Sequence, residues 1–223
     1  SVETAFDAGG RLDVVQGMVA GIEARSPAFL QALAEPAVEH WVKPARGTLA
    51  WHLQSAATSL SYGQVGRAAG SLDKGAPLLE GAVPLECSEF LYLQGKVLSA
   101  QDDGEGARSR FREALATQDH PRYRAAWAES ELRIRYQIDR ENDFADVLAQ
   151  LDGTDPYVLS IKARLMAAER RYPEALAVAA SFSGLQSLVT RAIVHSMMAQ
   201  PTEALQACTE ALACPEATGN SRL

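Results

Sequence analysis

Histidine and cysteine are the residues best suited to metal binding or nucleophilic catalysis, and their spacing in this chain supports neither. No two histidines form an HExxH or HxH arrangement, which would place two ligands on one helix face. The cysteines are odd in number and lack CxxC spacing. We therefore expect a packed histidine at His195, buried reduced thiols, no metal ion and no cofactor. The histidines and cysteines of the chain are His40, His52, His120, His195, Cys87, Cys208 and Cys214.

A glycine-rich segment, Gly63–Gly70, superficially resembles a phosphate-binding loop. It lacks the GxxxxGK[ST] pattern and no predicted strand precedes it, so the glycines are better explained by a turn between helices. No nucleophile elbow is present either. We therefore expect a protein that is not an enzyme.

Arginine is unusually dense between residues 108 and 135. Guanidinium groups suit carboxylates and phosphates, so we consider a candidate site for an anion or an acidic partner formed by Arg124, Arg133 and Arg135. An alternative is a salt-bridged solvent face, since Glu129 and Glu131 each precede an arginine by four residues in the favourable orientation. We favour this alternative. Residues 76–150 contain 14 acidic and 9 basic side chains, so this stretch has no positive surplus.

Composition indicates a helical protein. The 223 residues include 39 Ala and 25 Leu but only 14 Val and 5 Ile, which favours helices over strands. The formal net charge of -7 argues against nucleic-acid binding by the bulk surface. The sequence shows neither a signal peptide nor a stretch of 18 apolar residues, so we expect a cytoplasmic protein without a membrane partner.

The chain also repeats itself. The tripeptide Glu-Ala-Leu occurs at 113–115, 174–176, 203–205 and 210–212. Prolines recur at intervals of 37 and 35 residues, and proline is tolerated in the first turn of a helix. We therefore predict helix starts at Pro84, Pro121, Pro156, Pro173 and Pro201.

This pattern resembles the tetratricopeptide repeat (TPR), a 34-residue pair of antiparallel helices. In the best copy, residues 88–121, Gly95 matches the small residue where the two helices touch, and Phe111 matches the aromatic position of the second helix. Further copies fall at 156–182 and 185–212. The small residues at contact positions are Ala107, Ala114, Ala163, Ala175, Ala192, Ala204 and Ala211. The resemblance implies an all-α fold, a right-handed superhelical array of antiparallel helix pairs.

The remaining segments match the repeat less well. We interpret 1–83 as divergent helical hairpins of the same continuous array as 84–223, with helices around 12–22 and 49–60 and a short helix or connection at 26–36. Residues 122–155 should form one more pair, with helices at 127–136 and 144–151. Both ends of the array look open, so we expect the terminal helices to expose an apolar face. A piece of a longer protein explains this better than a face covered by another subunit, although oligomerisation through the ends is also considered.

The resemblance also implies a function. In this family the first helix of each unit lines a concave groove that commonly grips an extended peptide, while the family's carboxylate-clamp pattern is not matched here. The corresponding groove positions are Glu89, Tyr92, Lys96, Ser99, Tyr157, Ser160 and Arg164. We therefore expect a non-enzymatic scaffold that binds a peptide or protein through the groove or the array ends. The alternative is a ligand-sensing or oligomerisation domain of a larger bacterial transcription regulator.

Overall fold

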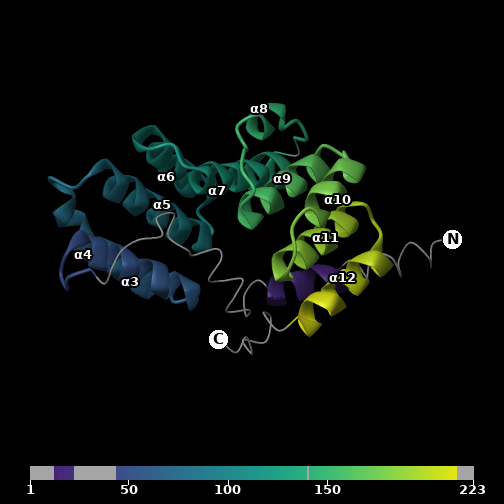
Figure 1. Cartoon of the computed structure of the whole chain (residues 1–223), viewed down its shortest axis with the longest axis horizontal. Coiled ribbons are helices and arrows are strands. Elements are labelled where there is room, and N and C mark those ends of the chain that lie inside the picture. Colours follow the sequence, from purple (N-terminus) through teal and green to yellow (C-terminus); the bar gives the residue numbers. More distant parts are fainter. Residues whose placement is uncertain (1–12, 23–43, 140, 215–223) are drawn as a thin grey trace. The chain divides into compact units, whose positions relative to one another are not determined.

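A computed structural model describes residues 13–22, 44–139 and 141–214 of the chain (Figure 1). Over these ranges the chain forms helices and no β-strand, so the predicted all-α class is confirmed. The contacts divide the chain into two compact units, Gln31–Glu141 and the combination of Ser1–Leu30 with Asn142–Leu223. Each unit is described by itself below.

The unit Gln31–Glu141 is built from helices that pack against their neighbours in the chain. Helix α3 pairs with α4, α5 with α6 and α6 with α7, while α5 also contacts α3 and α4. The elements are α3 (Leu49–Ser61), α4 (Val65–Gly75), the 3₁₀-helix η1 (Ala76–Leu79), α5 (Pro84–Ala100), α6 (Gly104–Thr117), α7 (Pro121–Glu131) and the π-helix η2 (Leu132–Ile138).

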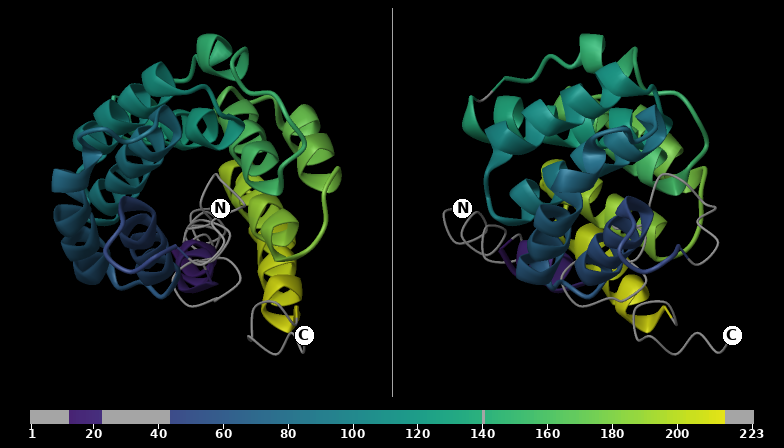
Figure 2. Two further views of the ribbon diagram at one scale, coloured as in Figure 1. Left: turned by 60° about the vertical axis from the view of Figure 1, so that its left-hand side comes forward. Right: turned by 90° about the vertical axis from the view of Figure 1, so that its left-hand side faces the viewer.

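The second unit repeats this arrangement. Helix α9 pairs with α10 and α11 with α12, and α11 also packs on both α9 and α10. Two views in Figure 2 show the pairing in the teal helices of one unit and in the yellow-green helices of the other. Besides a helix at 13–22, the elements are α8 (Ala145–Leu148), α9 (Pro156–Ala168), α10 (Tyr172–Ala180), α11 (Leu185–Met197) and α12 (Pro201–Ala213).

Proline begins the helices where the repeat pattern predicts it. Helices α5, α7, α9 and α12 each start at a proline, and Pro173 is the second residue of α10. Side chains satisfy further amide groups at the helix starts: the Asp155 carboxylate accepts from the Tyr157 backbone N–H at 2.8 Å, and Asp103 accepts from Gly106 at 2.9 Å. Local chemistry therefore sets these boundaries.

The predicted small residues lie at helix contacts. A Cβ atom on Gly95 would overlap ring atoms of Phe111, so only glycine lets α5 approach α6 this closely. The seven predicted alanines are all buried: Ala107, Ala114, Ala163, Ala175, Ala192, Ala204 and Ala211. Part of the alanine excess therefore reflects packing positions.

The predicted helix pair in 122–155 is only half correct. The first helix exists as α7 and η2, but the predicted second helix at 144–151 is reduced to the single turn α8. Helix α8 ends at Leu148, and in the connection to the next helix Gly153 adopts a left-handed φ of 110° and Asp155 caps α9. Phe144, Val147 and Leu151 are nevertheless buried.

The predictions for the flanking helices have mixed outcomes. The helices expected around 12–22 and 49–60 are present, with Val15, Val19 and Ile22 buried in the first. The expectation of an apolar outer face is wrong for α12. Its exposed residues are mainly polar, with Leu212 and Ala213 as exceptions: Thr202, Glu203, Gln206, Thr209, Glu210, Leu212 and Ala213. The expectations for Leu12 and for 26–36 lie outside the described residues.

Candidate functional site

The predicted groove residues on α5 belong largely to the interior. Glu89 and Tyr92 are buried, and the Tyr123 hydroxyl of α7 donates to Glu89 at 2.8 Å. The Tyr92 ring lies 5.1 Å from the Tyr123 ring and 5.9 Å from that of Phe111. Burial and the nearby Glu89 carboxylate raise the pKa values of Tyr92 and Tyr123 above the ordinary value of a tyrosine. The groove prediction is therefore wrong for Glu89 and Tyr92, because α6 and α7 cover them.

The two other predicted residues of α5 connect it to α7 and η2, which come after α6 in the chain. The Lys96 side chain is 12% exposed, lies 3.7 Å from Glu129 and sits above the Tyr92 ring at 5.7 Å. Ser99 is half-buried, and its carbonyl accepts from Arg133 at 3.4 Å. Both residues therefore hold α5 against α7 and η2.

The predicted groove residues on α9 show the same tendency. Tyr157 and Ser160 are buried, and the Ser160 hydroxyl hydrogen-bonds to Thr190 of α11 at 2.8 Å. Arg164 is half-buried. The prediction is wrong for Tyr157 and Ser160, because the packed helices leave neither side chain on a surface that a partner could touch.

The predicted anion site of three arginines does not form as one site. Arg124 pairs with Asp119 at 3.0 Å, Arg133 pairs with Asp102, and Arg135 pairs with Glu131 at 2.9 Å. Each guanidinium therefore has a separate carboxylate. The competing prediction of a solvent face is also only partly correct, because Glu129 pairs with Lys96 instead of Arg133, and Glu131 is buried.

Glu131 instead organises a different set of side chains, which we call the Glu131 cluster: Glu131, Arg108, Arg112, Arg135 and Trp127. The Glu131 carboxylate accepts from Arg112 Nη2 at 2.8 Å, from Arg135 Nε at 2.9 Å and from the Trp127 indole at 3.0 Å. Arg108 Nη1 lies 3.9 Å from it. The carboxylate side chain is 1% exposed, whereas that of Arg112 is 55% exposed.

In the sequence these arginines stand out only as members of the dense run between residues 108 and 135. Arg108 and Arg112 are four residues apart and so share one face of α6, while Arg110 on another face pairs with Glu113 at 2.6 Å. That spacing is the signal that could have separated the two faces. The spacing could not have shown that Glu131, on α7, lies beneath the face of α6 that carries Arg108 and Arg112.

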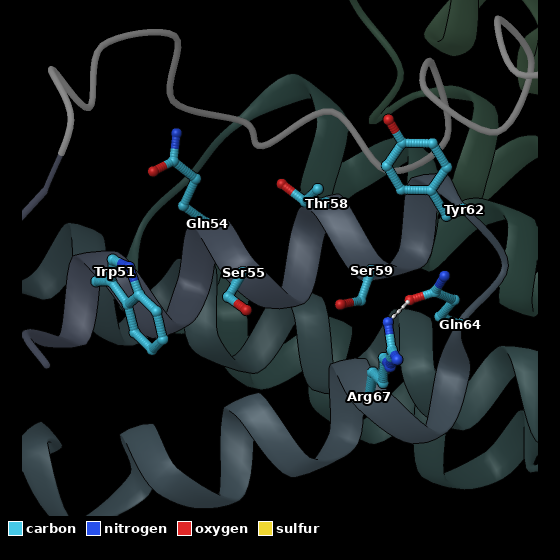
Figure 3. Close-up of a pocket in the computed structure, with 8 residues that line it drawn as sticks. All are labelled: Trp51, Gln54, Ser55, Thr58, Ser59, Tyr62, Gln64 and Arg67. Carbon is cyan, nitrogen blue, oxygen red and sulfur yellow. Dashed lines mark hydrogen bonds between the residues drawn. The ribbon is translucent and has the colours of Figure 1, made fainter. Parts of the chain in front are cut away.

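A second feature missed in the sequence is a shallow hollow on α3 and α4 with a volume of about 470 Å³ (Figure 3). Its α3 residues recur every three or four positions, which places them on one helix face, away from the buried residues such as Leu53 and Ala57. We call it the α3–α4 hollow. It is lined by Trp51, Gln54, Ser55, Thr58, Ser59, Tyr62, Gln64 and Arg67.

Aromatic and charged side chains mark the ends of this hollow. Figure 3 shows Trp51 and Tyr62 at opposite ends of the row on α3, and Tyr62 is 70% exposed. The exposed Arg67 of α4 donates to Gln64 Oε1 at 3.0 Å (Figure 3) and pairs with no carboxylate within the ranges described. The hollow thus offers two aromatic surfaces, neutral hydrogen-bonding groups and one guanidinium.

The segment Gly63–Gly70 comprises the turn after α3 and the first residues of α4. Gly63 adopts a left-handed φ of 66° directly after α3, a conformation that favours glycine. Gly66 and Gly70 lie inside α4. The predicted turn between helices is therefore confirmed at Gly63, whereas Gly66 and Gly70 belong to the helix itself.

The described residues provide no assembled centre for metal chemistry. They contain no group of three His, Cys, Asp or Glu side chains that could hold an ion. His195 is half-buried, with Nδ1 2.9 Å from Gln200. Cys208 is buried, which raises the pKa of its thiol, but Cys87 and Cys214 are only half-buried, contrary to expectation.

None of the described helices is long and apolar enough to span a membrane.

Known proteins give no guide to the function of this chain. No family model, no curated protein and no solved structure matches the chain. The Glu131 cluster and the α3–α4 hollow are therefore the candidate functional features of the described residues.

Proposed function

We propose that the chain is a non-enzymatic, TPR-like helical array that binds a peptide or protein partner. Its consecutive antiparallel helix pairs, the proline at the helix starts and the Gly95–Phe111 contact support this interpretation. The packing does not favour the predicted groove residues as the binding surface, because most of them are buried. The binding surface we propose is the α3–α4 hollow.

The aromatic and charged side chains that line the hollow are the observation that carries this proposal. Tyrosine, tryptophan and arginine dominate the energetics of many protein interfaces, because they supply rigid contact area and charge-assisted hydrogen bonds. All three residue types line the α3–α4 hollow. Most other large apolar side chains of α3 and α4, such as Leu53 and Leu72, are buried.

The dimensions of the hollow suit a short extended peptide. Trp51 and Tyr62 are eleven positions apart on one helix, which corresponds to about 16 Å along its axis. An extended chain covers this length with about five residues. The neutral side chains between the aromatic ends, such as Gln54 and Thr58, can bond to a peptide backbone. Arg67 favours a carboxylate on the peptide near the Tyr62 end.

A selection experiment tests this proposal. A displayed library of random peptides is selected on the purified protein, and the enriched peptides are measured against Arg67→Glu, Tyr62→Ala and the control Lys74→Glu. Lys74 is an exposed cation on the same helix outside the hollow, so its reversal matches the charge change at Arg67. We expect acidic peptides whose affinity falls about tenfold in either hollow variant, a loss typical of a hot spot, and stays unchanged in Lys74→Glu.

Two outcomes would contradict the proposal. One is enrichment of peptides that bind all four proteins equally. The other is a loss of affinity in Lys74→Glu as large as that in Arg67→Glu, which would indicate general charge attraction without a specific site.

A further inference from the structure

The connection between α4 and α5 is apolar in sequence but lies at the surface. Of the twelve residues 76–87, nine are Ala, Pro, Leu, Val or Cys, and none of the twelve is buried. Leu78 is 39% exposed and Val83 is 55% exposed, whereas most other large apolar side chains of the described ranges are covered. Apolar side chains gathered at a surface mark sites of protein interaction.

The backbone of this connection is preformed and presents a carboxylate. Residues 79–82 form a type II turn: φ and ψ of Glu80 are -65° and 113°, φ of Gly81 is 83°, and the last N–H donates to the first carbonyl at 3.1 Å. Pro77 and Pro84 restrict the backbone on either side. Glu80 is exposed at the tip and forms no ion pair with the described residues. We call residues 78–83 the 78–83 turn.

The 78–83 turn and the α3–α4 hollow are complementary in charge and in polarity. The hollow presents one guanidinium, that of Arg67, which pairs with no carboxylate in the part of the chain described. The turn presents one unpaired carboxylate. Tyr62 lies at the same end of the hollow as Arg67 (Figure 3) and is 70% exposed, while Leu78 and Val83 stand on either side of Glu80 in the chain. A guanidinium fork suits a carboxylate, and an aromatic ring suits apolar side chains.

The two surfaces lie at opposite ends of α4, so they do not meet within one copy. Arg67 is in the first turn of this helix, and the 78–83 turn follows its last residue, Gly75, through η1. From Arg67 to Gly75 the helix axis advances by about 12 Å. A contact between the hollow of one copy and the turn of the next is a head-to-tail contact.

From this complementarity we propose that the α3–α4 hollow binds the 78–83 turn of a second copy of this chain. Arg67 of one copy pairs with Glu80 of the next, and Leu78 and Val83 pack against Tyr62. This inference rests on the function proposed above, because the hollow is the receiving site, and it names the chain itself as the partner. The turn is compact and occupies the end of the hollow near Tyr62.

The expected association is reversible and depends on concentration. One turn in one hollow buries less surface than a stable interface requires. The formal net charge of -7 also opposes contact between copies. Attraction must therefore come from the local contact, which makes it sensitive to a single reversed charge.

A charge-swap experiment tests the contact by sedimentation equilibrium of the full chain at low ionic strength. The average mass of the wild type should rise above the 24.0 kDa of one copy as the concentration approaches about 1 mM. Arg67→Glu and Glu80→Arg each place like charges in contact and should weaken association at least about tenfold. In an equimolar mixture of these two variants every hollow can meet a turn of opposite charge, so association should return.

Two control variants match these changes in net charge. Lys74→Glu and Asp73→Arg alter exposed residues of α4 that belong to neither the hollow nor the turn. Both should associate about as strongly as the wild type. Losses as large as those in Arg67→Glu and Glu80→Arg would indicate a general effect of net charge and would overturn the proposal.

Peptide binding separates this inference from the function on which it rests. Glu80→Arg leaves the hollow intact and should bind the selected acidic peptides as the wild type does, whereas Arg67→Glu should lose both activities. A wild type that stays at the mass of one copy while it binds those peptides would overturn the self-contact and leave the proposed function standing. Absence of recovery in the mixture would also overturn it. Recovery in the mixture without any selected peptide would support the self-contact and contradict peptide binding.

Discussion

Helices α3 and α5 carry similar rows of aromatic and polar side chains, yet the two rows have opposite environments. On α5 the row includes Glu89 and Tyr92, which lie buried under α6 and α7. On α3 the row runs from Trp51 to Tyr62 and lines an open hollow (Figure 3). A tyrosine at helical spacing can thus be a core residue or a binding residue. What decides between them is whether another helix packs on that face.

The two tyrosines Tyr92 and Tyr62 allow the sharpest test of this difference. Tyr92→Ala should lower the free energy of unfolding by about 3–5 kcal/mol, because truncating a buried aromatic leaves a cavity. Tyr62→Ala should change it by less than about 0.5 kcal/mol, because the side chain is 70% exposed. Urea denaturation of both variants gives the comparison. Equal losses would show that the two rows do not differ in the way described.

A smaller loss of stability is expected for Tyr123→Phe, at the contact between α5 and α7. Tyr123→Phe removes the hydroxyl that donates to the buried Glu89 at 2.8 Å. Loss of a hydrogen bond to a charged group should lower the free energy of unfolding by about 1.5–3 kcal/mol. Peptide binding at the α3–α4 hollow should remain unchanged. A stable Tyr123→Phe variant that loses peptide binding would contradict the assignment of roles.

The smallest expected effect is a pH dependence of the free energy of unfolding, which also comes from Tyr123. Burial and Glu89 raise the pKa of Tyr123 in the folded protein above its value of about 10 in the unfolded chain. The folded state therefore holds the phenol proton more tightly. Its contribution is complete below pH 10 and is lost as the pH rises above that value.

Denaturation measured between about pH 9 and 11 tests this sign, since the unfolded tyrosine ionises in that range. The free energy of unfolding should fall with rising pH in the wild type and fall less steeply in Tyr123→Phe. The buried Tyr92 remains in the variant, so part of the slope should persist. Identical slopes would show that Tyr123 contributes nothing to the alkaline loss.

The sequence predicted the local features of the fold well because they depend on local chemistry. Proline begins α5, α7, α9 and α12 because its geometry suits a first turn, and alanine or glycine occupies the close contacts because a larger residue cannot fit. The exception is α8, which ends at Leu148 although the predicted helix extends to Leu151.

The candidate sites were harder to predict because they depend on contacts between distant residues. Tyr123 buries Glu89 from 34 positions away, and Arg112 reaches Glu131 from 19 positions away. Helical spacing shows which side chains share a face, as with Arg108 and Arg112, but not which faces are covered. The prediction of a groove on α5 is mostly wrong for this reason.

The most direct test of the proposed function is the Trp51 indole signal in ¹H–¹⁵N spectra during titration with a selected acidic peptide. Trp51 lines the α3–α4 hollow, so its signal reports on that surface and is assigned with Trp51→Phe. We predict a saturable shift in the wild type and in Lys74→Glu, and a much smaller shift in Arg67→Glu at the same subsaturating peptide concentration. A Trp51 signal that stays in place while the peptide binds would contradict the hollow as the partner-binding site.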